Sequence, residues 1–142
     1  MKISAKTEYA CLALKELALH WPKEAPLPMQ TIAKKQRIPM KFLTQILLQL
    51  KQQGLVESSR GKEGGYLLSK APKEIVLIHV LEIFSEMGLY KVTKNSIKKK
   101  VGVLTEIWAG ADEVLINYFN KITLEDICAK ERNLQKISMY TI

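Results

Sequence analysis

Residues 55–69 read LVESSRGKEGGYLLS, and this order predicts a β-hairpin. Two short strands, Leu55–Arg60 and Tyr66–Ser69, are expected on either side of a turn that holds three glycines in five positions. Glycine readily adopts the positive φ angles of tight turns, so we expect the three glycines to supply them. Arg60 and Lys62 stand at the shoulders of this turn. A small hairpin with a cationic tip is suited to a phosphate-lined groove.

The residues before the hairpin predict a helix, Pro39–Gln53, whose apolar residues recur every three or four positions. Pro39 suits the first helical position, and Gly54 suits the stop. The expected buried face consists of Phe42, Leu43, Ile46, Leu47 and Leu50.

A shorter helix, Pro28–Gln36, is expected upstream of the first. Its inward residues are expected to be Met29, Ile32 and Ala33. A turn of about three residues around Arg37 and Ile38 separates the two helices. The order helix, turn, helix, hairpin predicts a mainly α winged helix-turn-helix fold, in which the second helix enters the DNA major groove and the hairpin touches the flanking backbone or minor groove.

The charge of the chain is concentrated in its first half. The 142 residues carry a net charge of +8, and 47% of them are hydrophobic, as in ordinary globular proteins. Residues 1–70 hold 12 Lys and Arg against 5 Asp and Glu, whereas residues 71–142 hold 10 against 9. This asymmetry favours a polyanionic partner for the first half, the alternative being a solvated basic surface.

Nothing in the sequence predicts export, membrane insertion or catalysis. The N-terminus lacks a signal-peptide pattern, and no apolar run approaches the ~20 residues of a membrane span, so we expect a cytoplasmic protein. Cys11 and Cys128 both lie in apolar helical settings, which predicts unreactive thiols and no disulfide framework. With His20 and His79 they form no nucleophile or acid–base constellation, so the chain is not expected to be an enzyme.

The remaining segments divide the chain. A first helix, capped by Ser4 or Thr7, is expected to reach about Trp21, and another is expected over Ile75–Glu86. We therefore predict a DNA-binding domain over residues 1–86, a loop over 87–95, and a dimerisation helix with a C-terminal helix over 96–142.

A long helix is predicted from about Ser96 to Asn120. The seam of the expected dimer interface consists of Val101, Leu104, Trp108, Ala111, Leu115, Tyr118 and Ile122. A second apolar set, Ile107, Val114 and Phe119, is expected to face elsewhere, so the helix is expected to pack both on its own domain and on a second copy. Gly102 and Gly110 would each cost about 1 kcal/mol inside a helix, which favours a helix held by packing. The alternative is an intramolecular core helix.

A last helix is expected from an N-cap at Thr123, with Glu125 and Asp126 in its first turn, to about Asn133. For residues 134–142 the sequence leaves docking and fraying open.

Several segments together resemble one known family. They are MKISAKTEYA (residues 1–10), IPMKFLTQIL (38–47), and GLVESSRGKEGGYLLS (54–69) followed by a P-x-E-I helix start at Pro72. The chain resembles the Rrf-two family of bacterial winged-helix transcription regulators, strongly over residues 1–86 and more loosely at the Trp108 helix and the TLEDI segment. The RGxxGGY hairpin is the most specific element.

The resemblance implies a homodimeric repressor that binds a palindromic operator in double-stranded DNA. By position, Lys41, Thr44 and Gln45 would touch bases or phosphates, and Arg60 would reach into the minor groove. Side-chain chemistry agrees: Gln45 can pair with adenine, Lys41 with guanine or phosphate, and the Thr44 methyl with thymine. Many relatives carry glutamate at the position of Thr44, so the operator preference does not transfer.

Two further residues, Lys62 and Tyr9, complete the predicted DNA contacts. An alternative for this fold is a protein-interaction or RNA-binding module, since a winged helix alone does not fix the partner.

The sequence departs from the cluster-binding members of that family. They place three cysteines between the helix after the hairpin and the tryptophan of the long helix, and here Met87–Ile107 contains none. Five lysines stand there instead, and lysine does not ligate an iron–sulfur cluster. We therefore expect no cluster and no other cofactor. A small molecule or anion near these lysines, a protein partner, cysteine oxidation, or no effector at all stay open as the signal.

Overall fold

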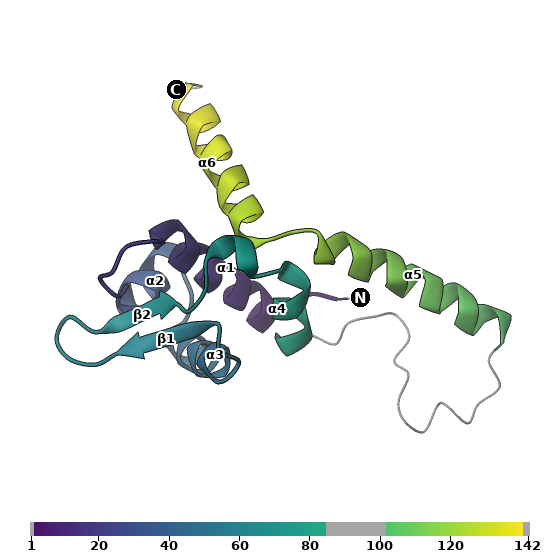
Figure 1. The fold of residues 1–142 in the computed structure, drawn as a ribbon, viewed down its shortest axis with the longest axis horizontal. Coiled ribbons are helices and arrows are strands. Elements are labelled where there is room, and N and C mark those ends of the chain that lie inside the picture. The colour runs from purple at the N-terminus through teal and green to yellow at the C-terminus, as the bar shows by residue number, and fades with distance from the viewer. Residues whose placement is uncertain (1, 85–101, 141–142) are drawn as a thin grey trace.

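The computed structural model describes residues 2–84 and 102–140 of the protein (Figure 1). The elements are α1 (Ala5–His20), α2 (Met29–Gln36), α3 (Met40–Gln52), β1 (Val56–Ser59), β2 (Gly65–Leu68), the 3₁₀ helix η1 (Pro72–Glu74), α4 (Leu77–Phe84), α5 (Val103–Asn120) and α6 (Leu124–Tyr140). The fold is mainly α with one antiparallel two-stranded hairpin, which confirms the predicted fold class.

The core is built around α1. Its buried face consists largely of alanine and leucine, so neighbouring elements approach it closely: Ala10, Ala13, Leu14, Leu17 and Ala18. The helices α3, α4 and α6 and the strand β2 all contact α1. Leu124 and Cys128 of α6 join this same core. The first turns of α6 are therefore packed with the N-terminal half, and the predicted division into domains stays a prediction.

The helix-turn-helix is closed by local backbone geometry. Arg37 ends α2 with a left-handed φ of 53°, and the Ile38 N–H donates to the Ala33 carbonyl at 3.0 Å. Ile38 is buried beneath the turn. Pro39 precedes α3 as its N-cap rather than beginning it. These residues confirm the turn expected around Arg37 and Ile38.

Gly54 ends α3 and turns the chain into the hairpin. Its φ of +75° suits glycine, and its N–H donates to the Lys51 carbonyl while the Leu55 N–H donates to the Leu50 carbonyl, both at 3.0 Å. This pair of bonds is the Schellman pattern, which satisfies carbonyls left free at a helix end. Gly54 therefore acts as the predicted stop.

The hairpin differs from expectation in how it uses its glycines. Val56 pairs with Leu68 and Ser59 with Gly65, so the register is set, but within the turn only Gly61 has a positive φ, of 108°. Gly64 and Gly65 serve close approach instead: a Cβ at Gly65 would collide with the carbonyl of Leu27. The expectation that all three glycines supply positive φ was therefore wrong for two of them.

The C-terminal helices have different bounds from those predicted. Gly102 is extended and caps α5, so it does not lie inside the helix; the expected start at residues 96–101 lies outside the described residues. The last helix continues to Tyr140, beyond the predicted end at Asn133. Leu77–Phe84 forms the helix expected over residues 75–86, of which the last two lie outside the described part.

In Figure 1, α5 extends away from the rest of the molecule. None of its residues is buried. Along residues 2–84 and 102–140, no helix is both long enough and apolar enough to cross a bilayer.

Candidate nucleic-acid interface

The exposed side of α3 carries the residues predicted to contact DNA. Leu43, Ile46, Leu47 and Leu50 are buried, which anchors the opposite side of the helix in the core. Lys41, Thr44 and Gln45 are all exposed. The structure therefore brings these three candidates together on one accessible helix surface.

Phe42 does not lie in the core as predicted. Its side chain is 38% exposed, and its ring stands 5.8 Å from the ring of Tyr9 on α1, centre to centre. The Lys41 ammonium lies 5.9 Å from the Phe42 ring centre, within the range of a cation–π contact. Tyr9, Lys41 and Phe42 thus form one cluster at the start of α3, because the aromatic ring of α1 gives Phe42 a partner outside the core.

The hairpin lies beside α3 and is tied to it (Figure 1). The Lys51 ammonium in the last turn of α3 donates a hydrogen bond of 2.7 Å to the Ser58 hydroxyl of β1. Arg60 and Lys62 are exposed at the tip of the hairpin. The two sets of predicted DNA contacts, one on α3 and one on the hairpin, therefore lie on neighbouring elements that this hydrogen bond joins directly.

Two features of α3 escaped the sequence prediction. Met40 and Leu48 are apolar yet exposed, by 39% and 55%. They stand four residues before and after Thr44, so a spacing of four, rather than the buried three-and-four pattern, was the signal that could have found them.

The residues predicted to form a dimer interface are mostly accessible in the single chain. Leu104, Trp108 and Tyr118 are exposed, while Ala111, Leu115 and Ile122 are half-buried; Val101 lies outside the described residues. Near the base of α5, an apolar groove of about 580 Å³ runs between α5, α6 and Leu77. Its lining residues include Tyr118, Phe119 and Ile122.

The cysteines do not fit an iron–sulfur cluster. Cys11 on α1 and Cys128 on α6 are the only two in the sequence, whereas a cluster needs a set of three or four ligands, mostly thiolates. Burial, and then the nearby Glu8 carboxylate, raises the pKa of the Cys11 thiol to about 11, and burial also raises the pKa of Cys128. Both thiols are therefore protonated at neutral pH. In the described ranges, no group of three or more His, Cys, Asp or Glu could hold a metal ion.

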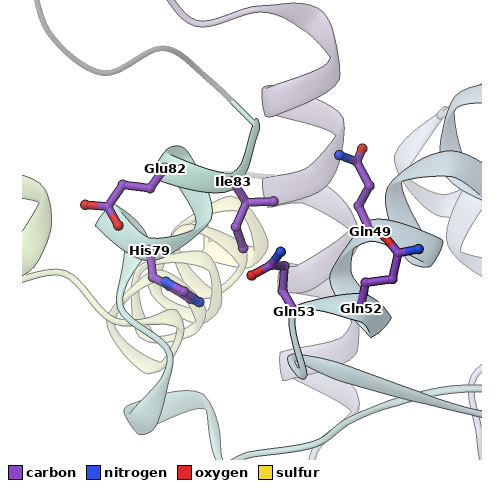
Figure 2. Close-up of a pocket in the computed structure, with 6 residues that line it drawn as sticks. All are labelled: Gln49, Gln52, Gln53, His79, Glu82 and Ile83. Carbon is purple, nitrogen blue, oxygen red and sulfur yellow. The ribbon is translucent and has the colours of Figure 1, made fainter. Parts of the chain in front are cut away.

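A polar cleft of about 360 Å³ lies between the end of α3 and α4 (Figure 2). Three glutamines of the α3 end, Gln49, Gln52 and Gln53, line one side, and His79, Glu82 and Ile83 of α4 line the other. The Gln49 Oε1 atom is buried and has no hydrogen-bond partner in the described part of the chain. The cleft therefore offers several hydrogen-bonding groups. The other histidine of the chain, His20, lies outside this cleft, and its Nε2 atom is hydrogen-bonded to the Ala25 carbonyl at 2.6 Å.

Comparison with known proteins agrees with this geometry. The model of the Rrf2 (Rrf-two) family, which is described as an iron-dependent transcriptional regulator, matches residues 3–130. The regulator IscR of Pectobacterium carotovorum is 31% identical over 134 residues, which cover 89% of this chain and 79% of the relative.

Two solved structures share the fold over nearly the whole chain. IscR of T. potens has a TM-score of 0.80 at 27% identity and covers 95% of this chain and 91% of its own. CymR, the global cysteine regulator of B. subtilis, has a TM-score of 0.79 at 26% identity, covering 92% and 98%. These relatives are regulators, which confirms that the chain is not an enzyme. The chain belongs to the Rrf2 family of DNA-binding transcriptional regulators.

Proposed function

We propose that the protein is a homodimeric, cytoplasmic repressor that binds a palindromic operator through α3 and the hairpin. The observation that supports this most directly is the joint exposure of Lys41, Thr44 and Gln45 on α3 beside Arg60 and Lys62 on the linked hairpin. Phosphate contacts by the cations would supply affinity, and contacts from α3 to base edges would choose the site.

The dimer is supported by the exposed apolar residues of α5. Leu104 and Tyr118 are 62% and 60% exposed, on a helix with no buried residue. Apolar surface of this extent on an extended helix is typical of a protein–protein interface. A second copy crossing at α5 would place two α3 helices on two half-sites.

We propose that the repressor works without an iron–sulfur cluster, since the cysteine set does not fit one. Its signal would then be a small molecule, an anion or a protein partner. The lysines expected near an anion, at positions 91–100, lie outside the described residues.

The test is capture of genomic fragments from the host by the purified protein at about 50 and 200 mM salt, the range over which phosphate-driven binding changes steeply. We expect a few palindromic fragments to persist at the higher salt. Uniform capture that disappears at higher salt would contradict sequence-specific binding and favour the RNA or protein partners of the alternative function.

Variants then assign the contacts on a retained fragment. Arg60→Ala and Gln45→Ala should each weaken binding by about 1–3 kcal/mol. Lys73→Ala is the matched control, because it removes one exposed positive charge from η1, outside α3 and the hairpin. Equal losses in Arg60→Ala and Lys73→Ala would reduce the role of Arg60 to net charge.

A further inference from the structure

An apolar stripe runs along the exposed side of α3. Met40, Thr44 and Leu48 are spaced by four residues, so they lie one above the other on the helix surface. All three are exposed, Leu48 by 55%. Single exposed apolar residues are ordinary, but these three adjoin the predicted base-contacting residues Lys41 and Gln45.

The hydroxyl hydrogen of the exposed Thr44 side chain is used within the protein. Its Oγ1–H donates to the Met40 carbonyl at 2.8 Å, one turn earlier in the same helix, and Oγ1 also lies 3.7 Å from the Met29 sulfur. A hydroxyl has a single hydrogen to donate. The groups left to meet a ligand are the methyl and an oxygen lone pair, so Thr44 extends the apolar surface between Met40 and Leu48.

In the major groove, the one apolar group that a base presents is the 5-methyl of thymine. We propose that α3 recognises its half-site by packing Met40, Thr44 and Leu48 against thymine methyl groups. The inference rests on the proposed function and adds the chemical group that is read. The charge of the surroundings fits DNA as the occupant, because Lys41, Arg60 and Lys62 are exposed on the same two elements. Gln45 next to the stripe can pair with the adenine of the same A·T base pairs.

The test replaces thymine by deoxyuridine at single positions in a fragment retained at the higher salt, which removes the methyl and leaves base pairing intact. Replacement at each contacted position should weaken binding about fourfold, which corresponds to the free energy of burying one methyl-sized group. Deoxyuridine in the flanks outside the site is the control. Unchanged binding at every thymine of the half-sites would overturn the inference.

A pair of variants separates the Thr44 methyl from its hydroxyl. Thr44→Val keeps the methyl and should keep the preference for thymine over uracil. Thr44→Ser keeps the hydroxyl but loses the methyl, so at the contacted position it should bind thymine and uracil with nearly equal affinity. The reverse ranking would overturn the inference. Leu48→Ala should likewise reduce the preference at a second position, and thermal melting of each variant checks that it is folded.

The two proposals fail in different ways. If no fragment is retained specifically, both the operator-binding function and the thymine reading fall. If fragments are retained and the deoxyuridine series is flat, only the thymine reading falls, and the stripe on α3 would then be a contact surface for another protein.

Discussion

Gly65 shows how a single residue sets the geometry of the hairpin. Leu27 and Tyr66 exchange two backbone hydrogen bonds of 2.9 Å beside it, so Leu27 adds a one-residue strand to the sheet. Gly65→Ala places a Cβ against the carbonyl oxygen and carbonyl carbon of Leu27, which are backbone atoms that cannot rotate away. We expect the free energy of unfolding to fall by about 1–3 kcal/mol, measured by urea denaturation.

The control for this change is Ser59→Ala, at the residue that pairs with Gly65 across the hairpin. Ser59 is exposed, so its variant should stay within about 0.5 kcal/mol of the wild type. A Gly65→Ala protein as stable as Ser59→Ala would show that Leu27 is free to move aside.

Cys11 should make stability depend on pH in the alkaline range. The pKa of its thiol rises from an ordinary 9.0 to about 11 in the folded chain, mainly through burial. Between these values the unfolded thiol has lost its proton and the folded one keeps it, so the free energy of unfolding should fall as pH rises from 9 to about 11. Below pH 9 this contribution should be constant.

Urea denaturation of the wild type and Cys11→Ala at several pH values isolates this contribution, because all other titrating groups are shared. The difference in stability between the two proteins should shrink across the window. A difference that stays flat from pH 8 to pH 11 would mean that the Cys11 thiol ionises equally in both states.

At the scale of elements, the local sequence pattern predicted which segments form helices and strands. Contacts with residues distant in sequence determine which residues at the margin of each buried face are exposed. The three-and-four spacing in α3 fits both Phe42 and Leu43, yet only Leu43 is buried. The ring of Tyr9, far away in sequence, gives Phe42 its contact, and one sequence does not show that pairing. Likewise the glycines of the turn could be predicted, but the close contact that requires Gly65 is with the backbone of Leu27, which is distant in sequence.

The end of α6 has a different cause. No glycine or proline follows Leu124 in the sequence, so nothing breaks the helix after Asn133, and it continues to Tyr140. Among the candidate site residues, those on α3 and the hairpin could be placed from the family motif, whereas the exposure of Met40 and Leu48 needed the packing of the opposite face.

The start of α6 rests on a reciprocal cap. The Asp126 N–H donates to the Thr123 hydroxyl at 3.2 Å, and the Thr123 N–H donates to the Asp126 carboxylate at 2.9 Å. Thr123→Ala removes the first of these bonds and should lower the free energy of unfolding by about 1 kcal/mol. Asn133→Ala, an exposed change inside the same helix, should leave stability unchanged or slightly higher. Equal stability of both variants would show that the N-terminus of α6 is held by Leu124 alone.

On the scale of the whole molecule, the two proposed surfaces lie on different parts of the fold. The hairpin and α3 lie together on one side, and α5 extends away from them (Figure 1). The charge follows this division, since residues 1–70 carry nearly all of the net positive charge. A protein arranged in this way can add a second copy through α5 without covering the proposed DNA-binding surface on α3 and the hairpin.

Charged residues on α5 should therefore separate the subunits and leave each one folded. Leu104→Lys with Tyr118→Lys places two charges on exposed positions, so the circular dichroism spectrum should be unchanged. The molar mass measured by light scattering should fall from twice the chain mass to the 16.2 kDa of a single chain. Glu113→Lys, at another exposed position of α5, is the control and should stay dimeric.

Because a palindrome is bound by two linked α3 helices, the monomer should lose specific operator binding while keeping weak, salt-sensitive binding to any DNA. A double variant that stays dimeric would place the interface outside α5, whereas a monomer that still binds the operator at full strength would show that one α3 and one hairpin are sufficient.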